Sequence, residues 1–452
     1  MNAWRWVTDA DAALLTDLYQ LTMAQAYVAE GLQGPAVFDL FVRRLPPSRN
    51  FLLACGLDSA LHYLETLTFG PEAIAYLGGL GPFTPRFLAY LAGFRFTGDV
   101  DAMPEGTPCF AGEPLLTVSA PLPEAQLVET FLLNQVHLQT MAASKAVRVV
   151  TAADGRSVAD FGLRHMHGAD AGLKAARAFS LAGVASTSNV LAGQSFGIPV
   201  SGTVAHSYIE AHAGEPDALR AFLRHYPETV LLVDTYDTLQ GVRHVIDLAR
   251  ELGPEFRVRG IRLDSGDLAA LARAARALLD AAGLGRVQIL ASGNLDETAI
   301  AALVAGGAPI DGFGVGTLMG VSSDAPYLDV AYKLVEYAGA GRMKTSPGKA
   351  TMPGRKQVVR VFADGVAVRD VVGLRAERLA GEPLLRPAMR QGKRSGAAPT
   401  LDESRQRAAS EVHRLPARVR ALAPAVPPYS VEISAGLARE RDAVRQRLLG
   451  ST

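Results

Sequence analysis

The chain has 452 residues, of which 45 are Lys or Arg and 45 are Asp or Glu, so its formal net charge is zero. This length exceeds the roughly 250–300 residues that one hydrophobic core supports, which predicts two or three domains, and the balanced charge excludes a nucleic-acid-binding protein that relies on overall positive charge. The only cysteines, Cys55 and Cys109, lie outside any CxxC pattern, which excludes a disulfide framework or a cysteine-based zinc site and fits a reducing cytosol.

Residues 1–150 are predicted to form an N-terminal α/β domain. The first residues carry aspartates where a signal peptide needs an apolar stretch, and no segment reaches the about 20 apolar residues of a membrane helix, so we expect a soluble cytoplasmic protein. Apolar spacing predicts a helix over 11–30 and a strand over 36–44. Residues 98–123 predict a small antiparallel β module, and 124–150, without Gly or Pro, predict a long helix.

A repeated pattern defines residues 151–345 as a second domain. Short apolar strands end in polar or glycine-containing clusters and are followed by helices, which indicates βαβ units and a parallel sheet. Six such units in series favour an α/β barrel, whose site would lie in the loops after the strands. The clusters are VADFGLRHMHG (158–168), VSGTVAHS (200–207), VLLVDTYDT (230–238), VRGIRLDSGD (258–267), VQILASGN (287–294) and DGFGVGT (311–317).

Residues 346–452 are predicted to form a C-terminal extension that packs back on the N-terminal domain. Within it, the segment 386–420 holds nine Lys or Arg with several Gly, Pro and Ser, which indicates a solvated basic linker and a surface helix. The segment YSVEISAGLARERDAVRQRLL (429–449) predicts a strand followed by a helix.

Acidic residues at two strand ends indicate a metal–phosphate substrate. The charged residues are Arg262, Asp264 and Asp267 in IRLDSGDL, and Asp234 and Asp237 in VDTYDT. Helix capping would account for one acid of IRLDSGDL, but not for both acids and the arginine. Magnesium is usually bound by one or two carboxylates together with substrate phosphates, so these loops suit a Mg²⁺–phosphate substrate.

Glycine-rich loops, ASGN (291–294) and GFGVGT (312–317), follow the last two predicted strands. Barrel enzymes often bind phosphate there, because glycines let backbone N–H groups approach an anion. A Rossmann motif would instead follow the first strand and read GxGxxG. Arg164, after the first strand of the series, is a candidate for binding a carboxylate or phosphate, or a surface arginine. His165 and His167 are two residues apart, which excludes a helical zinc motif.

His206 lies between a predicted strand and a predicted helix, with small neighbours in GTVAHS. It follows the same set of strand ends as the acids and the glycine loops. No second ligand stands at metal-binding spacing, because His212 is six residues further along the chain. His206 is therefore a core histidine, a nucleophile or a general base.

Eight motifs in this order resemble the nicotinate phosphoribosyltransferase family over about residues 14–360. They are TDLYQLTM (16–23), ASKAVRVVTAA (143–153), DFGLRHMHG (160–168), TSNVLAGQSFGIPVSGTVAHS (187–207), LVDTYDT (232–238), GIRLDSGDL (260–268), SGNLDE (292–297) and GFGVGT (312–317). The resemblance implies that the protein joins nicotinate to 5-phosphoribosyl-1-pyrophosphate, making nicotinate mononucleotide and pyrophosphate for NAD synthesis, with coupled ATP hydrolysis. It implies an irregular α/β barrel of the type II phosphoribosyltransferase kind beside an N-terminal α/β domain, in a homodimer with active sites at the interface.

The resemblance also implies residue roles. His206 would be phosphorylated by ATP, and Tyr19 would stack on the pyridine ring from the partner subunit. The other implied site residues are Arg262 and Asp264 in catalysis around the ring and ribose, Arg164, Thr203, Ser207 and Asp234 at the substrate, and Ser292, Gly293, Gly316, Thr317 and Thr351 at the phosphates. Mg²⁺ is the expected cofactor, without assigned ligands. His165 stands where many members have a second arginine, so a paired-arginine clamp does not carry over.

The chemistry of this reaction agrees with these residue types. Loss of pyrophosphate builds positive charge at the anomeric carbon, which a carboxylate such as Asp264 stabilises, and negative charge on the leaving group, which Mg²⁺ and fixed donors stabilise. A nicotinamide-specific relative is the nearest alternative, and a quinolinate enzyme would not use the histidine. From other classes, a Mg²⁺-dependent barrel lyase or isomerase would explain the acids but not the late glycine loops, and a nucleotide sensor would bind without turnover.

Overall fold

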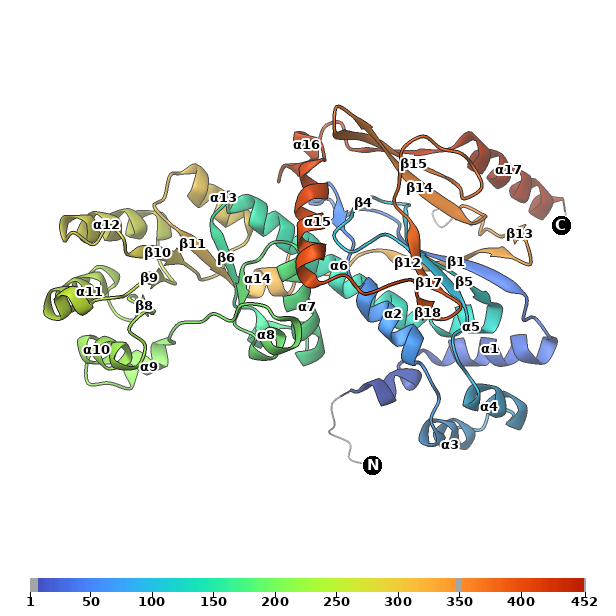
Figure 1. The fold of residues 1–452 in the computed structure, drawn as a ribbon, viewed down its shortest axis with the longest axis horizontal. Helices are drawn as coiled ribbons and strands as arrows, with labels where there is room; N and C mark the ends of the chain where they lie inside the picture. The colour runs from blue at the N-terminus through green and yellow to red at the C-terminus, as the bar shows by residue number, and fades with distance from the viewer. Residues whose placement is uncertain (1–6, 347–350, 451–452) are drawn as a thin grey trace. The chain divides into compact units, whose positions relative to one another are not determined.

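The structure is a computed structural model that describes residues 7–346 and 351–450 (Figure 1). Its contacts divide the chain into two compact units. The first unit combines Met1–Met141 with Tyr327–Thr452, and the second comprises Ala142–Pro326. Each unit has its own sheets, because every strand pairing stays within one unit.

A seven-stranded antiparallel sheet, in the order β13-β12-β1-β5-β3-β17-β18, belongs to the first unit. Its strands are β1 (Pro35–Val42), β3 (Asp99–Ala102), β5 (Pro114–Pro121), β12 (Val330–Tyr337), β13 (Ala340–Gly341), β17 (Arg386–Arg390) and β18 (Lys393–Arg394). The strand predicted over 36–44 and the β module predicted over 98–123 are confirmed. Because β17 pairs with β3, the C-terminal extension packs back on the N-terminal residues as predicted. The N-terminal residues and the C-terminal extension therefore form one unit. The sequence predicted them as two separate domains, with boundaries after residues 150 and 345.

The other elements of the first unit are shorter sheets and helices. The sheets are β16 (Glu382–Pro383), β14 (Lys356–Ala363), β15 (Val366–Leu374) and β19 (Ser430–Ile433) in that order, and β2 (Leu52–Leu53) with β4 (Pro108–Cys109). The helices are α1 (Leu18–Glu30), α2 (Leu57–Thr66), α3 (Pro71–Gly79), α4 (Pro85–Ala92), α5 (Leu122–Leu127), α15 (Leu401–His413), α16 (Ala417–Arg420) and α17 (Ala435–Leu449). The strand and helix predicted over 429–449 are confirmed as β19 and α17.

Three predicted segments differ from the structure. The helix predicted over 11–30 is a 3-10 turn (Asp9–Leu14) followed by α1, because Asp17 is extended where α1 begins. The helix predicted over 124–150 is divided at Val128 into α5 and α6 (Glu129–Ala152). The basic segment 386–420 is not a linker, because it contains β17, β18, α15 and α16.

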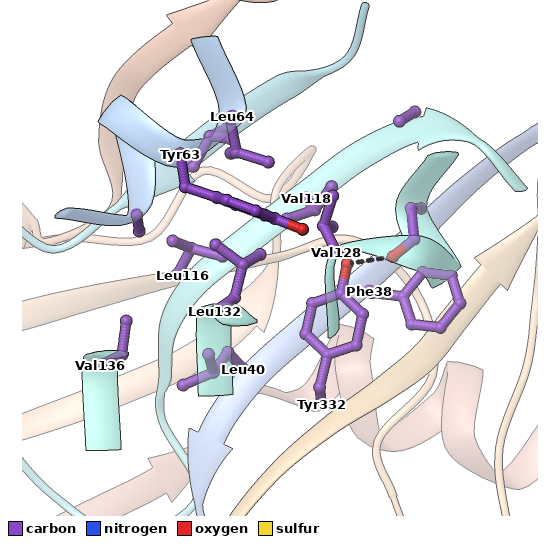
Figure 2. Packing of buried hydrophobic residues seen from close by; sticks show 14 of the residues in the cluster. Phe38, Leu40, Tyr63, Leu64, Leu116, Val118, Val128, Leu132, Val136 and Tyr332 are labelled. Atoms are coloured by element: carbon purple, nitrogen blue, oxygen red, sulfur yellow. Dashed lines mark hydrogen bonds between the residues drawn. The ribbon is translucent and has the colours of Figure 1, made fainter. Parts of the chain in front are cut away.

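The core of the first unit contains stacked aromatic rings (Figure 2). Phe38 of β1 stacks on Tyr332 of β12 with ring centroids 4.8 Å apart. Tyr332 is 1% exposed, and its hydroxyl donates to the carbonyl of Ala125 at 2.8 Å, which satisfies the buried oxygen. Figure 2 shows this bond joining β12 to helix α5, with apolar side chains such as Leu40 and Val118 packed alongside. The contacts tie three distant segments of the chain together.

A buried charge network joins β14, β15 and the turn before β5. Arg360 donates from Nε and Nη2 to the two oxygens of Asp370 at 2.9 and 2.6 Å. Tyr429 donates its hydroxyl to Asp370 at 2.8 Å, and Glu113 is completely buried. Burial, and then the neighbouring Asp370 carboxylate, raise the pKa of Glu113 well above its ordinary value. Glu113 is therefore protonated in the folded protein over a pH range where it is ionised in the unfolded chain.

The second unit contains a curled parallel sheet of six strands, in the order β7-β6-β11-β10-β9-β8. The strands are β6 (Ser157–Asp160), β7 (Ser186–Thr187), β8 (Val230–Leu232), β9 (Gly260–Leu263), β10 (Gln288–Ala291) and β11 (Gly312–Val315). A parallel bridge from Thr187 to Val200 adds one more segment beside β7. Within the described residues, only the junction between the Val200 segment and β8 lacks pairing. The predicted α/β barrel is confirmed in the form of a parallel sheet that curls but does not close, which we call the half-barrel.

Two strand assignments in this unit need correction. The strand predicted before His206 is only the single bridge at Val200, and β7 was not predicted. A two-residue strand is too short to show a hydrophobic period. The helices of the unit are α7 (Ala169–Leu181), α8 (Val190–Phe196), α9 (His206–Glu210), α10 (Glu215–His225), α11 (Thr238–Leu252), α12 (Leu268–Ala281), α13 (Glu297–Ala305) and α14 (Thr317–Gly320), with 3-10 turns at Leu163–His165 and Gly253–Glu255. No helix among the described residues is both long and apolar enough to cross a membrane.

We expect Glu113→Gln to change how stability depends on pH. Because the folded pKa of Glu113 is raised, protonated Glu113 contributes its full share to the free energy of unfolding at pH values below its unfolded pKa. This share is lost as pH rises through the folded pKa, at up to about 1.4 kcal/mol per pH unit. The neutral glutamine removes this loss, so the variant's free energy of unfolding falls less steeply as pH rises above the range in which an ordinary glutamate ionises. Denaturant unfolding at several pH values measures the effect.

The matched control is Glu72→Gln, because Glu72 is an exposed acid on α3 of the same unit. It should follow the pH dependence of the unaltered protein. Parallel curves for all three proteins would show that Glu113 ionises equally in the folded and unfolded states.

Candidate active site

His206 is the first residue of α9 and stands among the strand ends of the half-barrel. Its Nδ1 lies 3.1 Å from the hydroxyl oxygen of Thr235, in the loop after β8. Its Nε2 lies 3.7 Å from Oδ2 of Asp264, in the loop after β9. The side chain is 41% exposed, so His206 is not a core histidine. Two of the predicted roles of His206 are left, nucleophile and general base, because Thr235 contacts one ring nitrogen and the other faces the Asp264 carboxylate.

Asp264 is held in position by two neighbouring loops. Ser292, after β10, donates its hydroxyl to Oδ1 of Asp264 at 2.5 Å. Asp234, after β8, accepts at Oδ2 from the backbone N–H of Asp264 at 2.8 Å and from the hydroxyl of Ser265 at 2.7 Å. The second oxygen of Asp264 is left facing His206. Three predicted site residues, Asp234, Asp264 and Ser292, are therefore brought together with the histidine.

Helix capping accounts for the other two acids of these loops. Asp267 begins α12 and accepts from the backbone N–H of Ala270 at 3.0 Å. Asp237 begins α11 and accepts from the backbone N–H of Gln240 at 2.7 Å. These bonds satisfy donors that a helix start otherwise leaves free. The structure thus separates two capping acids from Asp234 and Asp264, a distinction that the sequence alone left open.

The carboxylates of Asp234 and Asp264 suit a divalent cation. Asp234 is 7% exposed, and its Oδ1 is buried without a hydrogen-bond partner among the described residues. A buried carboxylate oxygen without a partner carries a cost that a cation removes. Within residues 7–346 and 351–450, no group of three His, Cys, Asp or Glu side chains forms a metal-binding cluster. A metal here would therefore take its remaining ligands from substrate or water, as Mg²⁺ commonly does.

Two arginines supply positive charge near these acids. Arg262, at the end of β9, donates from Nη2 to the carbonyl of Val204 at 3.2 Å, while its buried Nε has no partner among the described atoms. Burial lowers the pKa of Arg262 and the charge of Arg164 acts in the same direction, whereas Asp264 and Asp234 oppose the shift. Electrostatically, the two arginines are thus neighbours.

The remaining predicted substrate residues of the second unit have weaker local contacts. Arg164 is exposed, and its Nε donates to Nε2 of His165 at 3.1 Å, so the residue in place of a second arginine orients the first. Thr203 is half-buried, with its hydroxyl 3.5 Å from the carbonyl of Val204. Ser207 is exposed as the second residue of α9.

The two predicted phosphate loops follow β10 and β11. Gly293 has a φ of +89°, and a Cβ there would lie 1.9 Å from the carbonyl oxygen of Asp264, so only glycine fits. Gly316 precedes the short helix α14, and a Cβ there would lie 3.2 Å from the carbonyl oxygen of Phe161. Thr317 is the first residue of α14. Both glycines allow close backbone approach, and Gly293 also determines where the Asp264 loop lies.

Two residues that help to build the site were not predicted. Asp160 is buried at the end of β6, where it accepts from the backbone N–H of Gly162 at 2.8 Å and from the hydroxyl of Thr187 at 2.7 Å. Burial raises the pKa of Asp160, against the effect of these hydrogen bonds. Asp160 thereby joins β7 to the loop that carries Arg164. Thr235, the partner of His206, lies inside VDTYDT, and its position beside Asp234 was the only sequence signal for it.

Tyr19 and Thr351 belong to the first unit, so their meeting with His206 stays a prediction. Tyr19 is 50% exposed near the start of α1, and burial, then the charges of Glu129 and Asp17, raise its pKa. Thr351 is buried and accepts at its hydroxyl from the backbone N–H of Lys344 at 3.0 Å.

Family models describe most of the chain. The model of the nicotinate phosphoribosyltransferase N-terminal domain matches residues 14–137. The model of the nicotinate phosphoribosyltransferase family matches residues 156–370, and that of its C-terminal domain matches 374–441.

Individual proteins agree with the family models. The chain is 55% identical to a nicotinate phosphoribosyltransferase of Mycobacterium tuberculosis, over 93% of this chain and 91% of that protein. It is 41% identical to the nicotinate phosphoribosyltransferase of Bacillus subtilis, over 78% of this chain and 74% of that protein. Its structure matches the crystal structure of human nicotinic acid phosphoribosyltransferase with a TM-score of 0.83 and 31% identity, covering 95% of this chain and 99% of the human one.

We expect Gly293→Ala to lower the free energy of unfolding by about 2–4 kcal/mol, because the new Cβ meets the Asp264 carbonyl and the backbone has a left-handed φ. Gly307→Ala is the matched control, since Gly307 has a φ of +63° with open space around its Cβ position. The control should lose only about 1–2 kcal/mol. Denaturant unfolding followed by circular dichroism compares them. Equal losses in the two variants would mean that the contact with Asp264 imposes no constraint.

Proposed function

The chain belongs to the nicotinate phosphoribosyltransferase family, and we propose that its half-barrel site uses His206 to couple ATP hydrolysis to the transfer reaction. The protein is a nicotinate phosphoribosyltransferase, an enzyme of NAD biosynthesis that acts on nicotinate and 5-phosphoribosyl-1-pyrophosphate. The ATP step, the metal, the residue roles and the dimer form the proposal. One observation carries it: an exposed histidine with one nitrogen held by Thr235 and the other directed at Asp264.

His206 acts first, as a nucleophile. The contact between Nδ1 and the Thr235 hydroxyl fits either tautomer of His206. In the tautomer proposed here, Nδ1–H donates to that hydroxyl oxygen, so the lone pair is on Nε2. Nε2 attacks the γ-phosphorus of ATP, so an N–P bond forms, the bond from the γ-phosphorus to the β–γ bridging oxygen breaks, and ADP leaves with that electron pair. The phosphorylated ring then carries added negative charge at the strand ends. That charge faces Asp264, 3.7 Å from Nε2, and the repulsion favours a cation between them.

Asp264 and Arg262 act in the transfer itself. As the pyrophosphate group leaves, positive charge develops on the ribose, and we assign its stabilisation to the Asp264 carboxylate, which Ser292 holds by a hydrogen bond. Arg262 has a buried unpaired Nε–H, which suits an anionic substrate group, and Arg164 adds a second cation. Nicotinate carries a carboxylate and nicotinamide does not, so this pair of cations favours nicotinate over the nicotinamide alternative.

Mg²⁺ is the proposed cofactor, with Asp234 and Asp264 as its protein ligands. The unpaired buried oxygen of Asp234 and the free oxygen of Asp264 fit that role. When bound with substrate phosphates, the ion would neutralise charge on the pyrophosphate group. The backbones at Gly293 and Gly316, with Ser292 and Thr317, line the loops proposed for the phosphates.

The quaternary structure is also proposed. A homodimer would let the exposed ring of Tyr19 stack on the pyridine ring in the partner's site, and Thr351 would contribute from the first unit. A cytoplasmic location is supported by the two buried free cysteines.

We expect γ-labelled ATP to leave an acid-labile, base-stable label on the protein that disappears when phosphoribosyl pyrophosphate and nicotinate are added. His206→Asn should abolish both the label and the ATP stimulation of pyrophosphate release, while slow ATP-independent transfer remains because the acids and phosphate loops are intact. His212→Asn is the control, since His212 lies on the same segment with Nδ1 at the Tyr208 carbonyl. ATP stimulation that survives in the His206 variant, or a label on another histidine, would exclude the phosphohistidine.

Nicotinamide should be a poorer substrate than nicotinate at equal concentration.

We expect Asp264→Asn to lower kcat by at least about 100-fold, because a charge that stabilises the transition state is lost. ATP hydrolysis without nicotinate should fall less. Asp267→Ala is the matched control on the same loop, and it should lose about 0.5–2 kcal/mol of stability as a helix cap and keep its turnover. Steady-state kinetics and thermal unfolding of both variants distinguish the roles. A stable Asp264→Asn enzyme with unchanged kcat would contradict the assignment.

A further inference from the structure

Tyr236 is an exposed aromatic residue for which the proposed reaction has no role, and it follows in the chain directly after Thr235, which contacts His206. It lies in the loop between β8 and α11, and its side chain is 65% exposed. The residues on either side of it are fixed, because Thr235 contacts Nδ1 of His206 and Asp237 caps α11. In the part of the chain that the structure describes, no ring or hydrogen-bond contact involves the Tyr236 side chain. Its backbone is therefore held at the strand ends while the faces of its ring remain open.

A second exposed tyrosine at the opposite end of β8 shows the contrast. Tyr226 precedes β8 and is 60% exposed, but its ring packs against that of Phe222 with centroids 4.9 Å apart. Tyr226 thus has a structural partner within its own unit, and Tyr236, at the end of the strand that carries the site, has none among the described residues.

We propose that Tyr236 is the stacking platform for the adenine base of ATP; this rests on the proposed function of His206. The γ-phosphate must reach Nε2 of His206, and Thr235, which contacts the other nitrogen of that ring, is the residue next to Tyr236. Consecutive Cα atoms are only about 3.8 Å apart, so one extended nucleotide can contact both His206 and the loop.

The charge beside Tyr236 favours the neutral adenine base over nicotinate, the other planar ring in the reaction. The exposed carboxylate of Asp237, which caps α11, lies one residue from Tyr236 and disfavours the carboxylate of nicotinate there. Adenine has a π-face and no charge, and aromatic side chains bind bases through stacking with little dependence on base identity. ATP and GTP should therefore both serve as phosphate donors.

The test compares ATP with inorganic tripolyphosphate, which has the same reactive phosphate chain but no base. Labelling of His206 is measured against donor concentration, with each donor labelled at its terminal phosphate. Tyr236→Ala should raise the half-saturating ATP concentration by about 5- to 100-fold, the range for loss of base–aromatic stacking, with less than about twofold change for tripolyphosphate. Tyr236→Phe should restore the ATP value, since the ring is retained. Tyr226→Ala, the matched control, should respond to ATP like the unaltered protein.

An equal response to both donors in Tyr236→Ala, or no change with ATP, would overturn the base platform. A rise in the KM for nicotinate with ATP half-saturation unchanged would also overturn it, because the ring would then serve the pyridine. If neither ATP nor tripolyphosphate labels the unaltered protein, the proposed function is overturned, and this inference with it.

Discussion

The candidate site depends on one buried carboxylate, that of Asp234 at the end of β8. Its Oδ2 binds the backbone N–H of Asp264 and the hydroxyl of Ser265, which ties the loop after β9 to the loop after β8. With Ser292 on its first oxygen, Asp264 can present only its second oxygen to His206. Hydrogen bonds to a charged acceptor are stronger than neutral ones, so the arrangement is preorganised before any substrate binds.

Charge balance is the second constraint on this site. Asp234 and Asp264 alone would repel nicotinate, phosphoribosyl pyrophosphate and the proposed co-substrate ATP, because all three are anions. Arg262 and Arg164 offset part of this charge, and the opposing effects of acids and arginine on the pKa of Arg262 show that these groups share one field. The proposed metal would supply the rest, and it would give a partner to the buried oxygen of Asp234 that has none among the described residues.

Buried ion pairs join segments that are distant along the chain within each unit. In the second unit, Lys145 of α6 is fully buried and binds Glu297 at the start of α13. In the first unit, Lys356 of β14 binds Asp39 of β1 at 2.8 Å, and both side chains are almost completely buried. Removing one member of such a pair leaves an uncompensated charge, so each pair disfavours alternative pairings of the same elements. The second pair fastens a late segment of the chain to an early strand.

The parallel strands, the polar residues at their ends and the placement of His206 among them could be predicted from the sequence, because strand period and strand ends are local properties. The partners of His206 could not, since Thr235 and Asp264 lie 29 and 58 residues away along the chain, and only the half-barrel brings them together. The different roles of the acidic residues could not be predicted either. Asp264 and Asp267 have the same chemistry and stand on one loop, and tertiary hydrogen bonds alone make the second a helix cap and direct the first at the histidine. Sequence determines which groups are available; long-range packing determines which of their atoms remain free to react.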